Sequence, residues 1–199
     1  MTAKPLRILI GGGARSGKSA FALERACRLG SRRVFVATAE ALDGEMQERI
    51  DRHRRERDAS FTTLEAPIDL PATIANAPTH AESAADVLVV DCLTLWISNL
   101  LVRGDGESRI HAEIDALAQT LEAPPCHVVL VSNEVGFGIV PENRLARDFR
   151  DLVGRAHQRI APICDELYLG AIGVIVRLRP APLEVVATNA LPRTPGPRA

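Results

Sequence analysis

Short runs of valine, isoleucine and leucine recur along the chain and are separated by longer polar or amphipathic segments. Such runs are typical of parallel strands that crossover helices bury on both faces. We therefore expect one α/β domain of the P-loop NTPase type, with a mostly parallel central sheet and helices on both faces. The predicted strands are residues 6–11, 33–38, 87–91, 127–132, 165–170 and 173–178.

Two segments between these runs have the periodicity of amphipathic helices. Apolar residues recur at steps of three and four within residues 110–121, and again within residues 145–160. Pro141 precedes the second segment and Pro162 follows it, and proline is disfavoured inside helices. Both segments are therefore predicted helices, and the second carries stop signals at both ends.

The pattern weakens toward the C-terminus. Residues 191–199 contain three prolines and show no apolar periodicity, a composition typical of mobile tails. We therefore expect the domain to cover residues 1–179 and a partly disordered C-terminal extension to cover residues 180–199.

Composition limits the kinds of partner. The chain has 199 residues, 46% of them hydrophobic, and a formal net charge of −1. This length supports one substantial core. The near-zero charge provides no global positive field for nucleic acid or an anionic membrane. We expect small nucleotides as partners, and no nucleic acid.

Cysteine usage and the apolar stretches indicate the compartment. The four cysteines are widely spaced and form neither a C-x-x-C pair nor a zinc-ligand cluster. The N-terminal apolar run is too short for a signal peptide. Residues 87–102 are apolar but contain Asp91 and Asn99, so they make a poor membrane span. We expect a reduced, cytoplasmic protein without a membrane span.

The first apolar run leads into a G-x-x-x-x-G-K-[ST] motif. Glycines let backbone N–H groups curl around phosphate oxygens, Lys18 supplies positive charge, and the Ser19 hydroxyl can bind Mg²⁺. A chance glycine-rich turn is the alternative, but the motif follows a predicted strand and opens a helical stretch, as it should. The motif comprises Gly12, Gly13, Ala14, Arg15, Ser16, Gly17, Lys18 and Ser19.

An acidic residue ends a neighbouring predicted strand. Asp91 follows the apolar residues 87–90, and ligands of open α/β sheets lie at the carboxyl ends of the strands. A carboxylate there commonly orients the Mg²⁺ of a phosphate loop. The alternative is that Asp91 caps the next helix. We take Asp91 and Ser19 as the candidate metal ligands.

Residues 49–58 contain five arginines and His53. The simplest interpretation is a solvated helix face with i,i+4 ion pairs. Alternatively, guanidinium groups bind phosphate oxygens bidentately, and a histidine among them is favoured as the neutral, nucleophilic imidazole. The sequence pattern leaves both open.

Residues 132–138 read Ser-Asn-Glu-Val-Gly-Phe-Gly and follow a predicted strand. They suit a strand-to-helix turn that needs flexible glycines. They suit equally well a substrate loop at the sheet edge, near the phosphates.

Together these segments resemble the bifunctional adenosylcobinamide kinase and adenosylcobinamide-phosphate guanylyltransferase family of cobalamin biosynthesis. The phosphate loop alone fits many NTPases, whereas the ordered set is specific. The resemblance covers most of the chain and rests on residues 11–19, Ala37-Thr38 with Asp43, Glu45 and Met46, Arg49-Ile50-x-x-His53, residues 91–96 and residues 133–151.

The resemblance implies two reactions. The first phosphorylates the aminopropanol hydroxyl of adenosylcobinamide with ATP or GTP. The second transfers GMP from GTP to the resulting adenosylcobinamide phosphate through a guanylylated histidine, and it yields adenosylcobinamide-GDP and pyrophosphate. His53 occupies the family's histidine position. The resemblance also implies a homotrimer.

Further site residues follow from the same resemblance. It implies catalytic roles for His53 and Lys18. Asp58 and Phe61 depart from the proline and tryptophan common in the family, and the chain continues past the usual end near Arg179. Beyond the phosphate loop, the nucleotide contacts it implies are Ala37, Thr38, Ala39, Arg54, Arg55, Glu56, Arg57, Glu65 and Asp91.

Two other functions compete with this one. The chain could be a phosphate-loop kinase for another small metabolite, with the arginine segment closing over ATP and no covalent step. It could also be a nucleotide-dependent switch with only slow hydrolysis.

Overall fold

A computed structural model describes residues 4–40, 44, 48, 60–80 and 84–188 of the chain. An eight-stranded sheet runs through it in the order β3-β2-β4-β5-β1-β6-β7-β8. Strands from β3 to β6 in this order are parallel, whereas β7 and β8 are antiparallel to their neighbours. The strands are β1 (Arg7–Gly12), β2 (Arg33–Ala37), β3 (Phe61–Glu65), β4 (Val87–Asp91), β5 (His127–Asn133), β6 (Glu166–Ala171), β7 (Val174–Arg179) and β8 (Glu184–Thr188).

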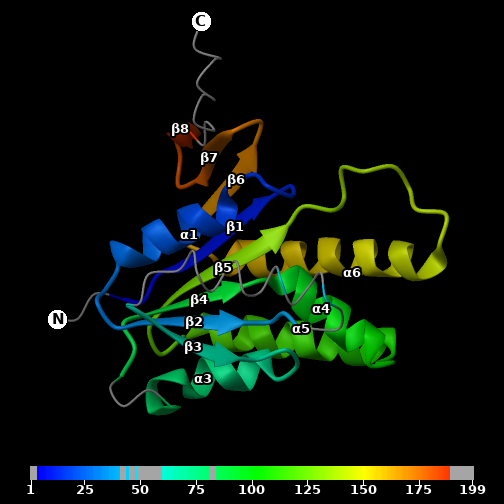
Figure 1. Ribbon diagram of the computed structural model, residues 1–199, viewed down its shortest axis with the longest axis horizontal. Helices are drawn as coiled ribbons and strands as arrows, with labels where there is room; N and C mark the ends of the chain where they lie inside the picture. Colours follow the sequence, from blue (N-terminus) through cyan, green and yellow to red (C-terminus); the bar gives the residue numbers. More distant parts are fainter. Residues whose placement is uncertain (1–3, 41–43, 45–47, 49–59, 81–83, 189–199) are drawn as a thin grey trace, which may run out of the picture.

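Helices cover both faces of the sheet (Figure 1). Helix α1 (Lys18–Cys27) lies on one face, and α3 (Leu70–His80), α4 (Leu93–Val102), α5 (Glu107–Glu122) and α6 (Arg144–Ile160) lie on the other.

Strand β4 shows why its sequence is continuously apolar. Val87 and Val89 pack in the same core cluster as α1, whereas Leu88 and Val90 pack in the cluster that includes α3 to α6. Alternate side chains point to opposite faces of a strand, so a strand covered on both faces needs apolar residues throughout. The predicted mostly parallel sheet with helices on both faces is confirmed.

The two predicted amphipathic helices are α5 and α6. Asn143 caps the start of α6, where its side-chain oxygen accepts hydrogen bonds from the backbone N–H groups of Leu145 at 2.8 Å and Ala146 at 3.4 Å. Such a cap satisfies donors that have no partner within the helix. A short 3₁₀ turn, Ala161–Ile163, follows directly and contains Pro162. The proline signal for the helix end therefore holds.

Four elements were not predicted. Strands β3 and β8 are the two edges of the sheet, and β3 alternates poorly because most of its residues are exposed or half-buried. Helix α4 is buried nearly all round, so it lacks helical periodicity. Helix α3 combines weak amphipathicity with two prolines.

The sheet continues past residue 179. Strand β8 pairs antiparallel with β7, so residues 184–188 of the expected C-terminal extension form part of the sheet. Residues 189–199 lie outside the described chain. Within the ranges that are described, no helix is both long enough and apolar enough to cross a membrane.

Candidate nucleotide-binding site

The phosphate loop joins β1 to α1 and needs its glycines for steric reasons. A Cβ on Gly12 would lie 2.7 Å from both the Gly170 carbonyl oxygen and the Ser16 hydroxyl oxygen. Gly17 immediately precedes α1 with a φ of 84°, a left-handed conformation that favours glycine. The loop therefore turns sharply into the helix, whose positive dipole end faces the loop.

Lys18 is the first residue of α1 and is only 7% exposed. Its Nζ donates a hydrogen bond to the Gly13 carbonyl oxygen at 3.1 Å. Ser19 follows in the first helical turn and is half-buried. The side chain of Lys18 thus reaches back over the loop, where a cation can neutralise bound phosphate.

Three predicted acidic or small residues end neighbouring strands in one row. Ala37 of β2 is in register with Glu65 of β3 on one side and with Asp91 of β4 on the other. Asp91 is half-buried, and Glu65 is exposed. The register places these positions at the carboxyl edge of the sheet, the same edge from which the phosphate loop emerges.

Thr38 fastens β2 to the turn that follows Asp91. Its hydroxyl donates to the Cys92 carbonyl oxygen at 2.8 Å and accepts from the Cys92 N–H at 2.7 Å. Asn99 of α4 donates to the Thr38 carbonyl oxygen at 2.7 Å. Thr38 is fully buried, so its hydroxyl holds the backbone that carries Asp91.

Lys18 and Asp91 both influence the pKa of the Cys92 thiol. Burial, followed by the Asp91 carboxylate, raises the pKa of the Cys92 thiol to about 11, and Lys18 acts in the opposite direction. Helix α1 and strand β4 also share one core cluster through Ala22 and Val89. The predicted cation and the predicted carboxylate therefore both act on the Cys92 thiol, at the sheet edge from which the phosphate loop emerges.

A second polar link connects the turn after β4 to the end of β5. Asn133 donates from Nδ2 to the Thr94 hydroxyl at 2.8 Å, and the Thr94 hydroxyl lies 3.0 Å from the Cys92 sulfur. These groups order the sheet edge between Asp91 and the phosphate loop. The sequence analysis placed Asn133 at this edge but gave it no partner.

Glu134, the next residue, touches the phosphate loop directly. Its backbone N–H donates to the Gly12 carbonyl oxygen at 3.0 Å. One carboxylate oxygen accepts from the Gly136 N–H at 2.6 Å, and the other lies 3.8 Å from Nδ1 of His157. The His157 Nε2 is 2.7 Å from the hydroxyl of Ser132.

The contacts of His157 with Ser132 and Glu134 were not predicted from the sequence. In the amphipathic pattern of α6, position 157 follows the buried Val153 and Ala156 at steps of four and one and precedes the buried Ile160. It therefore belongs near the apolar stripe, where a histidine needs a polar partner. A histidine beside the apolar stripe of a helix was therefore the sequence signal that could have indicated a polar partner for His157.

A pocket of about 440 Å³ lies beside the phosphate loop. Loop residues 13–16 and Glu134 contribute its polar wall, and apolar residues contribute much of the remainder. The lining residues are Gly13, Ala14, Arg15, Ser16, Glu134, Phe137, Leu169, Gly170, Ala171, Ile172 and Gly173.

Several predicted site residues lie outside the described residues. These are His53, Arg54, Arg55, Glu56 and Arg57. Ala39 is described and is half-buried just beyond β2. Within the described part of the chain, no three histidine, cysteine or acidic side chains cluster as a metal site would require. The oxygen donors of Ser19 and Asp91 nevertheless suit Mg²⁺, which takes few protein ligands and completes its shell with water and phosphate.

Comparison with known proteins identifies both a family and a fold. The family described as cobinamide kinase / cobinamide phosphate guanyltransferase matches residues 8–178. The bifunctional adenosylcobalamin biosynthesis protein CobP of Pseudomonas aeruginosa is 44% identical over 178 residues, which are 89% of this chain and 100% of the relative. The CobU proteins of Escherichia coli K12 and Salmonella typhimurium LT2 are 38% and 39% identical, each over 87% of this chain and 100% of the relative.

A solved structure supports the fold. The RadB recombinase aligns with a TM-score of 0.50 at 16% identity, covering 94% of this chain and 84% of its own. At that identity the likeness concerns the fold alone.

Proposed function

Because the chain belongs to the cobinamide kinase / cobinamide phosphate guanyltransferase family, we propose that it carries out both of that family's reactions. It phosphorylates adenosylcobinamide with ATP or GTP, and it then transfers GMP from GTP to give adenosylcobinamide-GDP. The observation that carries this proposal is the gathering of the phosphate loop, Lys18 and Asp91 at one sheet edge, in a chain that covers the full length of bifunctional relatives.

In the kinase reaction, the phosphate loop and Lys18 bind the nucleotide phosphates. Backbone N–H groups at the start of α1 and the Lys18 ammonium stabilise the charge that spreads over the transferring phosphoryl group. Ser19 and Asp91 would hold Mg²⁺, which neutralises phosphate charge when bound. Thr38 keeps the Asp91 backbone in place through its two hydrogen bonds to Cys92.

In the second reaction, His53 is the nucleophile. Its imidazole nitrogen forms a bond to the α-phosphorus of GTP while the bond to the β-phosphate oxygen breaks and pyrophosphate leaves. The phosphate oxygen of adenosylcobinamide phosphate then attacks the same phosphorus and releases His53. A covalent intermediate allows GTP to be cleaved before the acceptor binds. Arg54, Arg55 and Arg57 hold the GTP phosphates, and Glu56 and Glu65 complete the nucleotide contacts.

The chain assembles as a homotrimer in this proposal. The connection between β5 and α6 projects from the body of the molecule (Figure 1) and carries Phe137, Ile139 and Val140, which are 84%, 97% and 60% exposed. Exposed apolar side chains on one segment favour a protein interface. Light scattering on the purified protein should give three times the chain mass, and Ile139→Ser should shift it toward the monomer. A monomeric wild-type protein would contradict the trimer.

The proposed compartment is the cytoplasm, with small-molecule substrates and no nucleic acid. All four cysteines are free thiols, three of them buried, which fits a reducing environment. The formal net charge of −1 gives nucleic acid no electrostatic attraction.

Labelling with GTP that carries radioactive α-phosphate tests the covalent step. The wild-type protein should form an acid-labile, alkali-stable adduct, and His53→Ala should form none. His111→Ala is the matched control, because His111 is a half-buried histidine of α5 whose ring contacts Glu107 and Arg155. An adduct that persists in His53→Ala would overturn the assignment of the nucleophile. If the wild-type protein formed no adduct but still phosphorylated adenosylcobinamide, the chain would be a kinase without the proposed covalent guanylyl transfer.

A further inference from the structure

Glu134 is fixed relative to the phosphate loop through its own backbone. It follows the last residue of β5, and its N–H donates to the Gly12 carbonyl oxygen at 3.0 Å. Gly12 is the residue at which β1 passes into the phosphate loop. Any shift of Glu134 away from the loop would break this hydrogen bond, so the backbone of Glu134 has a defined position beside the phosphate loop.

One hydrogen bond orients the carboxylate, and one ring lies beside it. The Gly136 N–H donates to Oε1 at 2.6 Å, which closes a tight turn on the side chain. The His157 ring reaches the second oxygen from α6, with Nδ1 at 3.8 Å from Oε2. Glu134 is half-buried, so the hydrogen bond from Gly136 holds one side of the carboxylate while part of it stays accessible from the pocket.

The ring of His157 is held by a buried hydroxyl group. Its Nε2 lies 2.7 Å from the Ser132 hydroxyl, and Ser132 is fully buried. Burial lowers the pKa of His157, and the Glu134 carboxylate opposes this shift to a smaller extent. The neutral imidazole is therefore favoured near neutral pH, and it lies beside the carboxylate without cancelling its negative charge.

Glu134 also faces the space where a second substrate can enter. It lines the pocket of about 440 Å³ together with loop residues 13–16. Phe137 and Ile172, which are 84% and 101% exposed, and the half-buried Leu169 form apolar parts of the same wall. A nucleotide's phosphates need the loop, so an apolar surface next to the loop suits the organic body of an acceptor.

We propose that Glu134 is the general base for the acceptor hydroxyl in the kinase reaction, and that His157 is a positioning residue for its carboxylate. This inference rests on the proposed function. The hydroxyl proton passes to Glu134 as the acceptor oxygen forms its bond to the γ-phosphorus. The bond between that phosphorus and the β,γ-bridging oxygen breaks, and its electron pair leaves with the nucleoside diphosphate.

Separate assays of the two half-reactions with Glu134→Gln test the proposal. The variant should phosphorylate adenosylcobinamide with a kcat lowered about 100-fold or more, and the KM for nucleotide should change little. Labelling from GTP at the nucleophile involves no acceptor hydroxyl, so it should proceed at the wild-type rate. Glu142→Gln is the matched control, because Glu142 is an exposed carboxylate of the same loop and does not line the pocket.

Three outcomes would overturn the inference. An unchanged kinase kcat in Glu134→Gln would show that Glu134 is not the general base. Equal losses in both half-reactions mean that the residue supports the loop rather than the proton transfer. A wild-type protein that labels with GTP but phosphorylates no cobinamide refutes the proposed kinase activity, and the inference fails with it.

A double-mutant cycle tests the role of His157. His157→Ala alone should lower the kinase kcat about tenfold while labelling from GTP continues. In the Glu134→Gln background it should have no further effect on kcat, because the group it positions is already gone. Losses that multiply in the double variant would show that His157 acts independently of Glu134 and would overturn its positioning role.

Discussion

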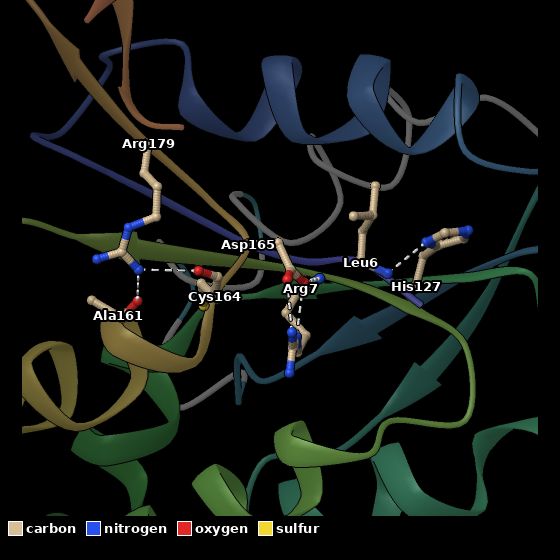
Figure 2. Close-up of polar contacts among 7 residues, drawn as sticks. All are labelled: Leu6, Arg7, His127, Ala161, Cys164, Asp165 and Arg179. Carbon is tan, nitrogen blue, oxygen red and sulfur yellow. Dashed lines mark hydrogen bonds and ion pairs between the residues drawn. The ribbon is translucent and has the colours of Figure 1, made fainter. Parts of the chain in front are cut away.

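Polar side chains differ between the carboxyl ends of the strands, here called the carboxyl edge, and the amino ends, here called the amino edge. At the carboxyl edge, Glu134 lines the pocket beside the phosphate loop, Lys18 donates to the Gly13 carbonyl oxygen, and Asp91 ends β4. At the amino edge, polar groups pair with one another across the strands (Figure 2). Parallel strands bring all their carboxyl ends to one side, so the candidate ligand-binding residues gather there, beside polar groups such as Thr38 and Asn133 that join segments of the same edge.

The amino edge is organised around an ion pair between β1 and the residue before β6. Arg7 donates to Asp165 from Nε at 2.8 Å and from Nη2 at 2.7 Å, and its backbone N–H donates to the same carboxylate at 2.9 Å. Arg179 donates from Nη1 to the carbonyl oxygens of Ala161 and Cys164, and His127 accepts from the Leu6 N–H (Figure 2). These bonds join segments far apart in sequence.

The largest expected effect is on catalysis at the carboxyl edge. Lys18→Met keeps the apolar stem and removes the charge that we propose stabilises the transferring phosphate. Both transfer rates should fall about 100- to 1,000-fold, while the thermal midpoint stays close to wild type. Lys4→Met is the control, since Lys4 is exposed at the opposite edge. A large loss of stability in Lys18→Met would contradict the expectation that Lys18 contributes to catalysis rather than to folding.

The next effect is on stability at the amino edge. Arg7→Met removes charged hydrogen bonds from a side chain that is 10% exposed, and the free energy of unfolding should fall by about 2 kcal/mol. Activity at room temperature should be unchanged. Arg28→Met, in an exposed helical ion pair with Glu24, should cost less than about 0.5 kcal/mol. Equal costs in the two denaturation curves would remove the special role of Arg7.

Thr38 sharpens the comparison because it lies at the catalytic edge yet is fully buried. Thr38→Val keeps the shape but removes both hydrogen bonds to Cys92, so unfolding should become easier by about 1 to 2 kcal/mol. The backbone of Asp91 should also loosen, and the transfer rates should fall several-fold. Thr73→Val serves as a control, because the Thr73 hydroxyl is exposed on α3. A Thr38→Val protein with full activity would mean that the Cys92 clamp does not position Asp91.

The smallest expected effect is the pH dependence of the amino edge. The hydrogen bond from Arg7 lowers the pKa of Asp165 below its ordinary value of 3.8. The stabilisation is therefore present above that value and is lost as the pH falls through the lower, folded-state pKa. The difference in thermal midpoint between wild type and Asp165→Asn should narrow from about pH 6 to about pH 2. A constant difference over this range would show that the ionised carboxylate contributes nothing.

The central strands of the sheet were predicted from the sequence, whereas the outermost strands, β3 and β8, were not. Strand β4 is apolar on both faces and was predicted with its correct bounds, whereas β3 and β8 each have one neighbouring strand and weaker patterns. The phosphate loop and Asp91 were identifiable because their chemistry is encoded in consecutive residues. The partnership of Glu134 with His157 spans two elements, and only the packing of α6 against the end of β5 reveals it.

We propose that one sheet edge supports two successive transfers to a cobinamide. The most direct measurement is mass spectrometry of the products formed by purified protein from adenosylcobinamide, ATP and GTP. We expect adenosylcobinamide phosphate as a transient species, followed by adenosylcobinamide-GDP with release of pyrophosphate. Unchanged adenosylcobinamide, in the presence of protein that still binds nucleotide, would contradict it.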